Sequence, residues 1–137
     1  MRKAWSLGAA LMATTILAGC SAVDLVGTGR VAGTYELRSV NGYQVPAVYY
    51  EEPGYRLEVL NANFTLENDG TFTEALILRE TVRGSTNTSS TSTYGNYDYY
   101  NGEFTFDEAG GHRYYGRING STLIIEDEGV TMEYRRL

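Results

Sequence analysis

The chain has 137 residues, of which 42% are hydrophobic and 20% charged, with 11 Lys+Arg against 17 Asp+Glu. This length suits one small globular domain, because folding units typically have about 100–200 residues. The formal net charge of −6 argues against a nucleic-acid partner, since binding to phosphates needs clustered Lys and Arg. One Cys and one His exclude an intrachain disulfide, a cysteine zinc cluster and a multi-histidine metal site, and we expect no metal and no other cofactor.

The first 20 residues have the layout of a secretory signal peptide. Arg2 and Lys3 make a short positive region, and Leu7–Leu17 is an apolar stretch too short to span a bilayer. This stretch ends in Leu17-Ala18-Gly19-Cys20, which resembles the lipobox of bacterial lipoproteins. In that family the chain is cleaved before the Cys, whose thiol takes a diacylglycerol and whose new amino group is usually acylated.

The lipobox resemblance divides the chain into a signal peptide (residues 1–19), a lipidated Cys20 with a short tether (20–30) and a domain (31–137). Cleavage leaves 118 residues with nine Arg and all 17 acidic residues, so the formal net charge becomes −8. Two or three acyl chains hold a protein durably on a membrane, whereas one chain binds only marginally. Ser21 stands where Asp would retain an enteric lipoprotein in the inner membrane, which implies the outer membrane of a bacterial cell envelope.

From Val31 onward, apolar residues recur at every second position, and turn residues interrupt them at short intervals. This period of two is typical of β-strands with one buried face. Asn68-Asp69-Gly70, Asn101-Gly102 and Asn119-Gly120 supply the positive-φ residues of tight hairpin turns. The strands expected from this pattern are residues 31–39, 55–59, 62–66, 71–82, 103–107, 112–118, 122–126 and 130–136, with 94–100 as a further candidate.

Successive strands joined by tight turns predict an all-β, up-and-down antiparallel sheet. About eight such strands can close into a barrel whose interior holds side chains or one small ligand, and closure removes the exposed edges of the sheet. We therefore predict a small up-and-down antiparallel β-barrel of about eight strands.

Two segments of this barrel need separate treatment. The apolar phase shifts from odd positions in residues 55–59 to even positions in 62–66, which predicts a bulge or a turn around Asn61. Residues 84–93 consist of one Gly followed only by Ser, Thr and Asn. We expect a long, mobile hairpin tip there; the alternative is a polar extension of the flanking strands, since Thr favours extended geometry.

Gly33-Thr34-Tyr35, followed by Glu36-Leu37-Arg38-Ser39-Val40-Asn41-Gly42, resembles the opening of lipocalin-like domains, which have Gly-x-Trp there. In that family an Arg of the last strand packs across the Trp and closes the base of the barrel. The resemblance implies that Arg135 or Arg136 lies over Tyr35, which replaces the Trp, in a cation–π contact. Because the chain ends at Leu137, we predict a lipocalin-like barrel without the C-terminal helix of true lipocalins.

The polar residues of the domain lack a catalytic arrangement, and we expect no enzyme. His112 is the only imidazole, it follows two glycines, and the chain has no Gly-x-Ser-x-Gly motif. We interpret the acidic clusters at residues 51–52 and 126–128 as solvated turns. Glu74 and Glu80 share the inward phase of residues 72–82; we expect them in water at the barrel ends, and the alternative is a contact with an interior Arg, Tyr or ligand.

The tyrosines lead to two functional hypotheses for a membrane-anchored, non-catalytic envelope lipoprotein. The leading hypothesis is a barrel that binds a small apolar or amphipathic ligand inside, against the inward-facing residues Tyr35, Leu37, Leu57, Phe104, Phe106, Tyr114, Ile125 and Met132. The alternative is a protein-interaction or inhibitor module with a filled barrel and a Tyr-rich outer surface, made of Tyr94, Tyr97, Tyr99 and Tyr100.

Overall fold

Ten strands and one helical turn make up residues 28–137, the part of the chain that the computed structural model describes. They are α1 (Thr28–Val31), β1 (Gly33–Val40), β2 (Tyr43–Gln44), β3 (Ala47–Glu52), β4 (Tyr55–Leu66), β5 (Thr71–Val82), β6 (Ser85–Tyr100), β7 (Glu103–Glu108), β8 (Arg113–Asn119), β9 (Thr122–Asp127) and β10 (Val130–Arg136). Burial alternates along most strands, as their period-two sequence requires.

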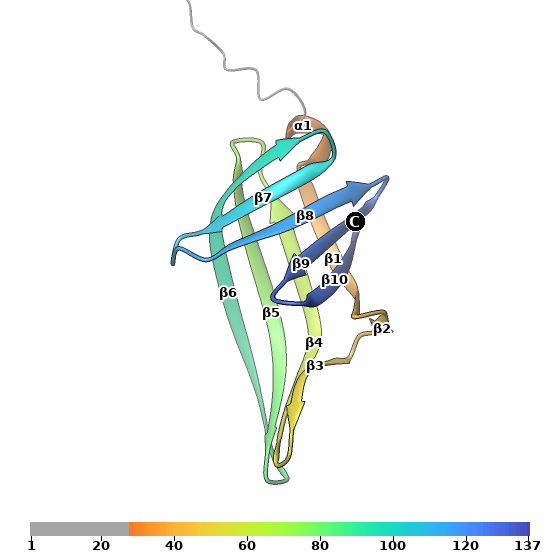
Figure 1. Cartoon of the computed structure of the whole chain (residues 1–137), viewed down its shortest axis with the longest axis vertical. Coiled ribbons are helices and arrows are strands. Elements are labelled where there is room, and N and C mark those ends of the chain that lie inside the picture. Colours follow the sequence, from red (N-terminus) through yellow and green to blue (C-terminus); the bar gives the residue numbers. More distant parts are fainter. Residues whose placement is uncertain (1–27) are drawn as a thin grey trace, which may run out of the picture.

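Eight of these strands close into a barrel (Figure 1). The sheet runs β2-β1-β10-β9-β8-β7-β6-β5-β4-β3, its neighbours pair in antiparallel fashion, and β1 also pairs with β4. This last pairing, in which Tyr35 lies opposite Phe64, joins the two ends of the row from β1 to β4. The prediction of a small, all-β, up-and-down antiparallel barrel of eight strands is confirmed.

A contact at the α1 end covers one end of the barrel. The Arg136 guanidinium lies 5.9 Å from the centre of the Tyr35 ring, so Arg136, rather than Arg135, makes the cation–π contact. Arg136 also donates hydrogen bonds to the carbonyl oxygens of Arg30 (2.9 Å) and Ala32 (2.5 Å), and the Tyr35 hydroxyl donates to that of Val31 (2.6 Å). These bonds hold residues 28–31 in a helical turn, which corrects our expectation that the first strand begins at Val31.

The core of the barrel is a stack of aromatic rings. Phe106 lies at its centre, with ring centroids 5.1 Å from Phe64, 5.2 Å from Phe72 and 5.2 Å from Tyr114. These spacings are those of rings in direct contact. The core also contains the buried side chains of Tyr35, Leu37, Val40, Val59, Ala62, Leu66, Tyr97, Phe104, Leu123, Ile125, Met132 and Tyr134.

A bulge in β4 reconciles its two apolar phases. The register of β4 against β5 shifts between Val59 and Asn61, where the sequence predicts a bulge or a turn. Val59 is buried on the odd phase and Ala62 on the even phase. One extra residue therefore keeps both halves of β4 facing the same side of the sheet.

Four strands extend past the barrel and form an arm, made of residues 48–58 of β3 and β4 and residues 77–90 of β5 and β6 (Figure 1). The arm lies at the end of the molecule opposite α1. The expected mobile tip at residues 84–93 is wrong, and the alternative, a polar extension of the flanking strands, is the one observed, because residues 85–93 belong to β6 and pair along their whole length with β5. The turn takes only Arg83 and Gly84, both with positive φ (47° and 85°), as a tight primed turn requires.

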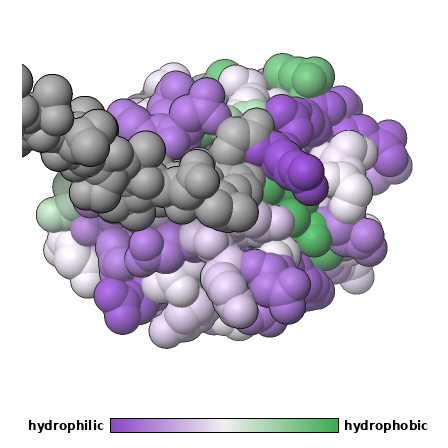
Figure 2. Space-filling view, turned by 90° about the horizontal axis from the view of Figure 1, so that it is seen from above, coloured by the Kyte–Doolittle hydropathy of each residue, from purple (hydrophilic) through white to green (hydrophobic). Residues whose placement is uncertain are grey.

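The surface at the α1 end is mostly hydrophilic. Outside the grey segment, Figure 2 shows purple and white residues with small, separate green patches. Within residues 28–137, no helix is long and apolar enough to span a bilayer.

Gly95 lies where β6 begins to pair with β7. A Cβ atom on Gly95 would overlap the backbone oxygen of Asp107, on the paired strand. Backbone on both sides leaves little freedom to relieve this overlap, so β6 can approach β7 here only with a glycine.

We predict that Gly95→Ala destabilises the protein by about 1–3 kcal/mol or more, because the added methyl group forces two paired strands apart. The measurement is the free energy of unfolding in urea. Gly110→Ala is the matched control, since a Cβ atom at Gly110 meets no atom within 4 Å. Equal stability of the two variants would contradict the steric argument.

Candidate functional site

The structure separates the residues that we expected to line an interior ligand site. Seven of the eight are buried in the core: Tyr35, Leu37, Phe104, Phe106, Tyr114, Ile125 and Met132. Leu57 is only half-buried, and it lies in the arm, opposite Tyr50 on β3 and Glu80 on β5. Its position in the alternation is that of an inward-facing residue, but this first part of β4 belongs to the arm, and β4 enters the barrel only further along the chain.

Side chains occupy the middle of the barrel. Besides the contacts of Phe106, the rings of Phe64 and Phe72 stack at 5.3 Å, and Phe104 stacks on Phe106 at 5.4 Å. Four hollows of about 290 to 470 Å³ occur on the described surface, and none of them is lined by Phe64, Phe72, Phe106 or Tyr114. The central rings are thus packed against each other rather than around one of these hollows.

A buried carboxyl group interrupts this apolar core. Glu74 is only 7% exposed, because the even positions of β5 face inward, and the Tyr134 hydroxyl donates a hydrogen bond to its Oε1. Burial raises the pKa of Glu74 from 4.5 to about 7, against the opposing effect of the Tyr134 hydrogen bond and with a further rise from Glu108 and Asp127. The expectation that Glu74 lies in water is therefore wrong, and the alternative contact with an interior Tyr is the one observed.

Two hydroxyl groups in the barrel are buried without a hydrogen-bond partner: those of Tyr114 and Thr93. Thr93 lies opposite Glu74 in the β5–β6 register, and the negative charge of Glu74 contributes to the raised pKa of Tyr114, after burial. Glu74 therefore has polar neighbours with unused hydrogen-bonding capacity.

His112 and Asp127 form a polar pair on the barrel rim. The Nε2 atom of His112 lies 2.8 Å from Oδ1 of Asp127, and its ring centroid is 5.7 Å from that of Tyr114. The hydrogen bond to Asp127 raises the pKa of His112. The pair connects the β7–β8 loop to the end of β9 and gives His112 a structural partner.

Glu80, the other inward glutamate of β5, lies in the arm. It is half-buried and faces Leu57 across the β4–β5 register. Its hydrogen bond with Tyr55 raises the pKa of that tyrosine. Glu80 is thus a polar residue of the arm and takes no part in the barrel core.

The tyrosines of β6 divide between the two faces of the sheet. Tyr97 is buried, its hydroxyl donates to the Glu67 carbonyl oxygen at 2.6 Å, and burial raises its pKa to about 12. Tyr99 is half-buried against Phe104, at 4.7 Å between ring centroids. Only Tyr94 and Tyr100 are exposed (66% and 84%), so the expected outer surface of four tyrosines has two.

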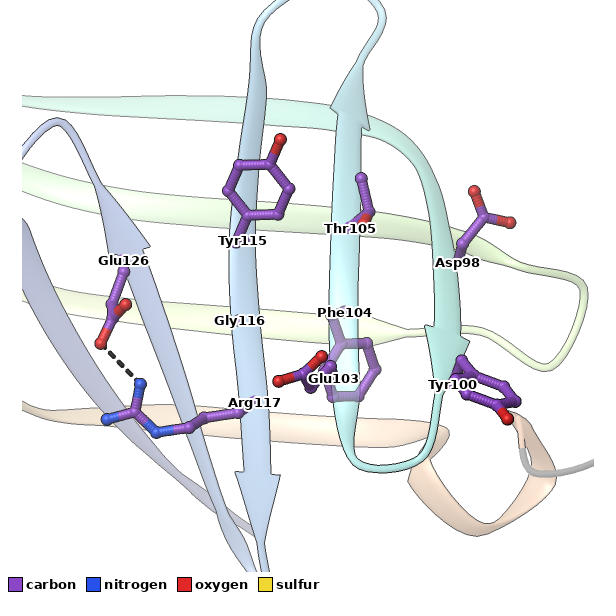
Figure 3. A pocket seen from close by; sticks show the side chains of 9 residues that line it. All are labelled: Asp98, Tyr100, Glu103, Phe104, Thr105, Tyr115, Gly116, Arg117 and Glu126. Atoms are coloured by element: carbon purple, nitrogen blue, oxygen red, sulfur yellow. Dashed lines mark hydrogen bonds and ion pairs between the residues drawn. The ribbon is translucent and has the colours of Figure 1, made fainter.

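The exposed Tyr100 lies beside a surface hollow of about 440 Å³ on the outer side of β6, β7, β8 and β9 (Figure 3). Tyr115, 58% exposed, provides a second ring there; sequence analysis missed it, although its position next to the inward Tyr114 places it on the outer face. Asp98 and Glu103 add carboxylates. Arg117 is paired with Glu126 at 2.6 Å, so the hollow has an excess of negative charge.

Comparison with known proteins gives no assignment: no protein-family model, no curated protein and no solved structure matches the chain. The fold is a small closed antiparallel barrel, and its function must be inferred from its own residues. The geometry offers two sites, the Glu74 cluster inside the barrel and the Tyr100–Tyr115 hollow outside it.

We predict that the free energy of unfolding falls by roughly 3 kcal/mol between pH 4.5 and pH 8 because of Glu74 alone. Its pKa is higher in the folded protein, which therefore binds more protons than the unfolded chain between pH 4.5 and about 7. Glu74→Gln accepts the same hydrogen bond without a charge and should flatten this profile in urea titrations at each pH.

His112 gives a change of the same sign, because its raised pKa adds stability below pH 6.5 that is lost as the pH rises through the folded value. The double variant Glu74→Gln/Asp127→Asn should therefore show a smaller slope than Glu74→Gln alone, because it also removes the partner that raises the pKa of His112. Glu103→Gln, at an exposed glutamate of β7, is the matched control for the loss of a carboxylate. A profile in Glu74→Gln as steep as that of the wild type would contradict the assignment.

Proposed function

We propose that this protein is a lipid-anchored, non-catalytic binding module of the bacterial cell envelope that binds a partner polypeptide through the Tyr100–Tyr115 hollow. The observation that carries the proposal is the packing of the barrel: aromatic rings fill its middle, whereas two exposed tyrosine rings lie beside a hollow on its outer face. Of the two hypotheses from the sequence, this arrangement favours the filled barrel with an outer binding surface.

The chemistry of the hollow favours basic side chains on the partner. Asp98 and Glu103 supply carboxylates, while the positive charge of Arg117 is already paired with Glu126. Tyrosine rings attract Arg and Lys through cation–π contacts, and they provide contact area at low entropic cost. An Arg or Lys side chain between Tyr100 and Tyr115 would satisfy both requirements.

The membrane anchor rests on Cys20, which lies outside the described residues. The lipobox resemblance and the preceding apolar stretch support it. The β6–β7 turn, which follows Tyr100, lies beside α1, the element nearest to the tether (Figure 1). An anchor at Cys20 would therefore place the hollow at the membrane end of the domain and the arm at the far end.

A second candidate function is the binding of a small amphipathic molecule in the barrel. Two buried hydroxyl groups near the Glu74 carboxyl group, those of Tyr114 and Thr93, favour it, because neither has a hydrogen-bond partner. A polar ligand group could satisfy both hydroxyls, but the packed rings would have to move to admit it.

The test of the proposed function uses a fluorescently labelled nonapeptide of arginine as the probe. Its affinity should fall about tenfold in the double variant Tyr100→Ala/Tyr115→Ala, because two cation–π contacts are worth roughly 0.5–1 kcal/mol each. Fluorescence anisotropy measures the binding. Tyr43→Ala is the matched control, since Tyr43 is 74% exposed on β2, away from the hollow.

Equal loss of affinity in the double variant and in Tyr43→Ala would refute the hollow as the binding site. So would binding of a glutamate nonapeptide as tight as that of the arginine peptide. Enhanced emission of an apolar fluorescent probe that depends on Glu74, with arginine-peptide binding unaffected by the double variant, would favour the second candidate.

The anchor has a separate test. We predict that the full chain expressed in a bacterial host fractionates with membranes, and that Cys20→Ser moves it to the soluble fraction by removing the thiol that takes the lipid. Ser21→Ala is the control, because it leaves the lipobox Cys in place. Mass spectrometry of the wild-type protein should detect acyl chains on the N-terminal peptide, and an unmodified Cys20 would refute the anchor.

A further inference from the structure

The arm has two outer edges that differ in their protection against further strand pairing. Its β3 edge carries the features that natural sheets use to block pairing: a register bulge between Val48 and Tyr50, the carboxylates of Glu51 and Glu52, and flanking prolines at positions 46 and 53. Short length and negative charge make this edge a poor template for another strand.

The β6 edge has none of these features. Residues 85–93 pair with β5 but, among the described residues, with no strand on their other side. Beyond them, the carbonyl oxygen of Tyr94 accepts a hydrogen bond from the N–H of Ala109 at 2.9 Å, and Gly95–Tyr100 pair with β7. The edge contains only Ser, Thr and Asn, without a charged residue or a proline, and its pairing with β5 shows no register shift. It thus presents nine residues whose outer backbone groups have no strand partner in the described part of the chain.

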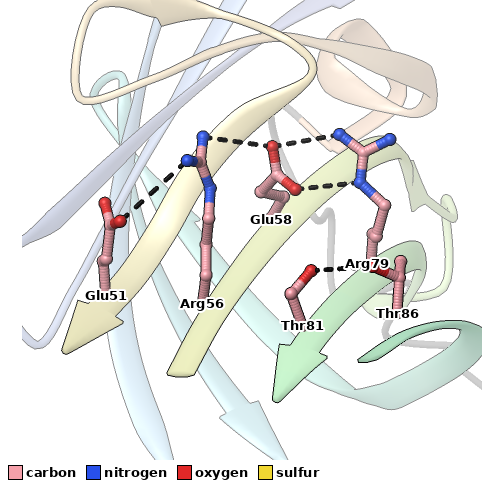
Figure 4. Close-up of polar contacts among 6 residues, drawn as sticks. All are labelled: Glu51, Arg56, Glu58, Arg79, Thr81 and Thr86. Carbon is pink, nitrogen blue, oxygen red and sulfur yellow. Dashed lines mark hydrogen bonds and ion pairs between the residues drawn. The ribbon is translucent and has the colours of Figure 1, made fainter. Parts of the chain in front are cut away.

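Ion pairs between side chains connect the strands of the arm that lie behind this edge. Glu58 of β4 is 8% exposed because two arginine side chains fold over it (Figure 4). Arg79 of β5 reaches its Oε2 at 2.8 Å, and Arg56 reaches its Oε1 at 3.3 Å and approaches Glu51 of β3 at 3.9 Å. This network connects β3, β4 and β5 on one face of the arm.

We propose that the β6 edge pairs in antiparallel fashion with the β6 edge of a second copy of this chain, related by a two-fold axis near Ser89. The backbone groups of an open edge are recognised by the backbone of another extended strand. The two arms then form one continuous sheet of eight strands, from β3 of one copy to β3 of the other.

A second copy fits this edge because the segment is self-complementary. With a two-fold axis near Ser89, each of residues 85–93 faces a Ser, Thr or Asn of the other copy. Pairs of Ser and Thr stabilise neighbouring strands through hydroxyl hydrogen bonds, and no like charges face each other. In a chain with a formal net charge of −6, this edge is a place where two copies can meet without repulsion.

The assembly also closes. Pairing through β6 is isologous, since each copy uses the same surface, and it consumes both open edges at once. The edges left at the two ends of the eight-stranded sheet are the protected β3 strands. A dimer is therefore the end point, and a fibre is not.

The proposal is independent of the binding function proposed above, because the arm and the β6–β7 turn lie at opposite ends of the molecule. One polar edge makes a small interface compared with the about 1,200–2,000 Å² of standard ones, so we expect a weak, reversible dimer. Its detection needs a method that traps short contacts.

The test is a cysteine scan along β6 in intact cells that express the full chain. Single substitutions Asn87→Cys, Thr88→Cys, Ser89→Cys, Ser90→Cys and Thr91→Cys are oxidised, and disulfide-linked dimers are quantified on gels. Antiparallel pairing brings a residue within disulfide range of its own copy only near the two-fold axis. We expect the yield to peak at one of the central positions and to fall at least fivefold two residues away on either side.

The controls are Glu51→Cys on the β3 edge and the wild-type chain, which contains Cys20. Yields on β6 no higher than these controls, or equal at all five positions, would overturn the proposal. In sedimentation velocity of the purified full chain, Ser90→Lys should abolish the dimer, and Ser121→Lys, in an exposed turn, should leave it unchanged. Unchanged melting temperatures keep this comparison free of folding defects.

Discussion

The pairing of β1 with both β10 and β4 is the constraint on which the rest of the structure depends. It joins the two ends of the sheet, with Tyr35 opposite Phe64 on one side and Arg136 on the other. Closure fixes the radius of the barrel, and the aromatic stack around Phe106 fills the resulting space. The Arg136 contact with Tyr35 and the carbonyl groups of Arg30 and Ala32 then covers the α1 end of this stack.

Closure on such a small radius leaves little interior space for a ligand. A barrel of eight strands has room for side chains or for one small ligand, and here large rings take that room. The polar exception, Glu74, is stabilised by Tyr134 but remains costly to ionise, which makes the core sensitive to pH near neutrality. Exposed tyrosines and carboxylates instead gather over β6 to β9, on a rigid surface that the filled barrel supports.

The barrel could be predicted from the sequence because the patterns that indicate its strands and turns each lie within a short stretch of residues. Period-two alternation and Gly-containing turns specify hairpins one after another, and the phase change in β4 places the bulge near Asn61. The extension of β5 and β6 into the arm was only the second of two alternatives that the sequence left open. Residues 85–93 contain no apolar residue and so have no inward phase; their extended geometry comes from pairing with β5, a contact that no local pattern encodes. The same limit applies to the outer site, where Tyr100 was expected but Tyr115 was missed, because the two lie on β6 and β8, which the fold brings to either side of β7.

The arm has open sheet edges, whereas closure of the barrel removes such edges. Closing the barrel removes two sheet edges, yet β3 to β6 continue past it and expose two new ones. If both edges served only to end the sheet, both should carry charges, prolines or bulges, because an open edge invites association. Only β3 does. The absence of such features over nine residues of β6, in a chain that carries 17 acidic residues, is most simply explained by a strand that completes the sheet.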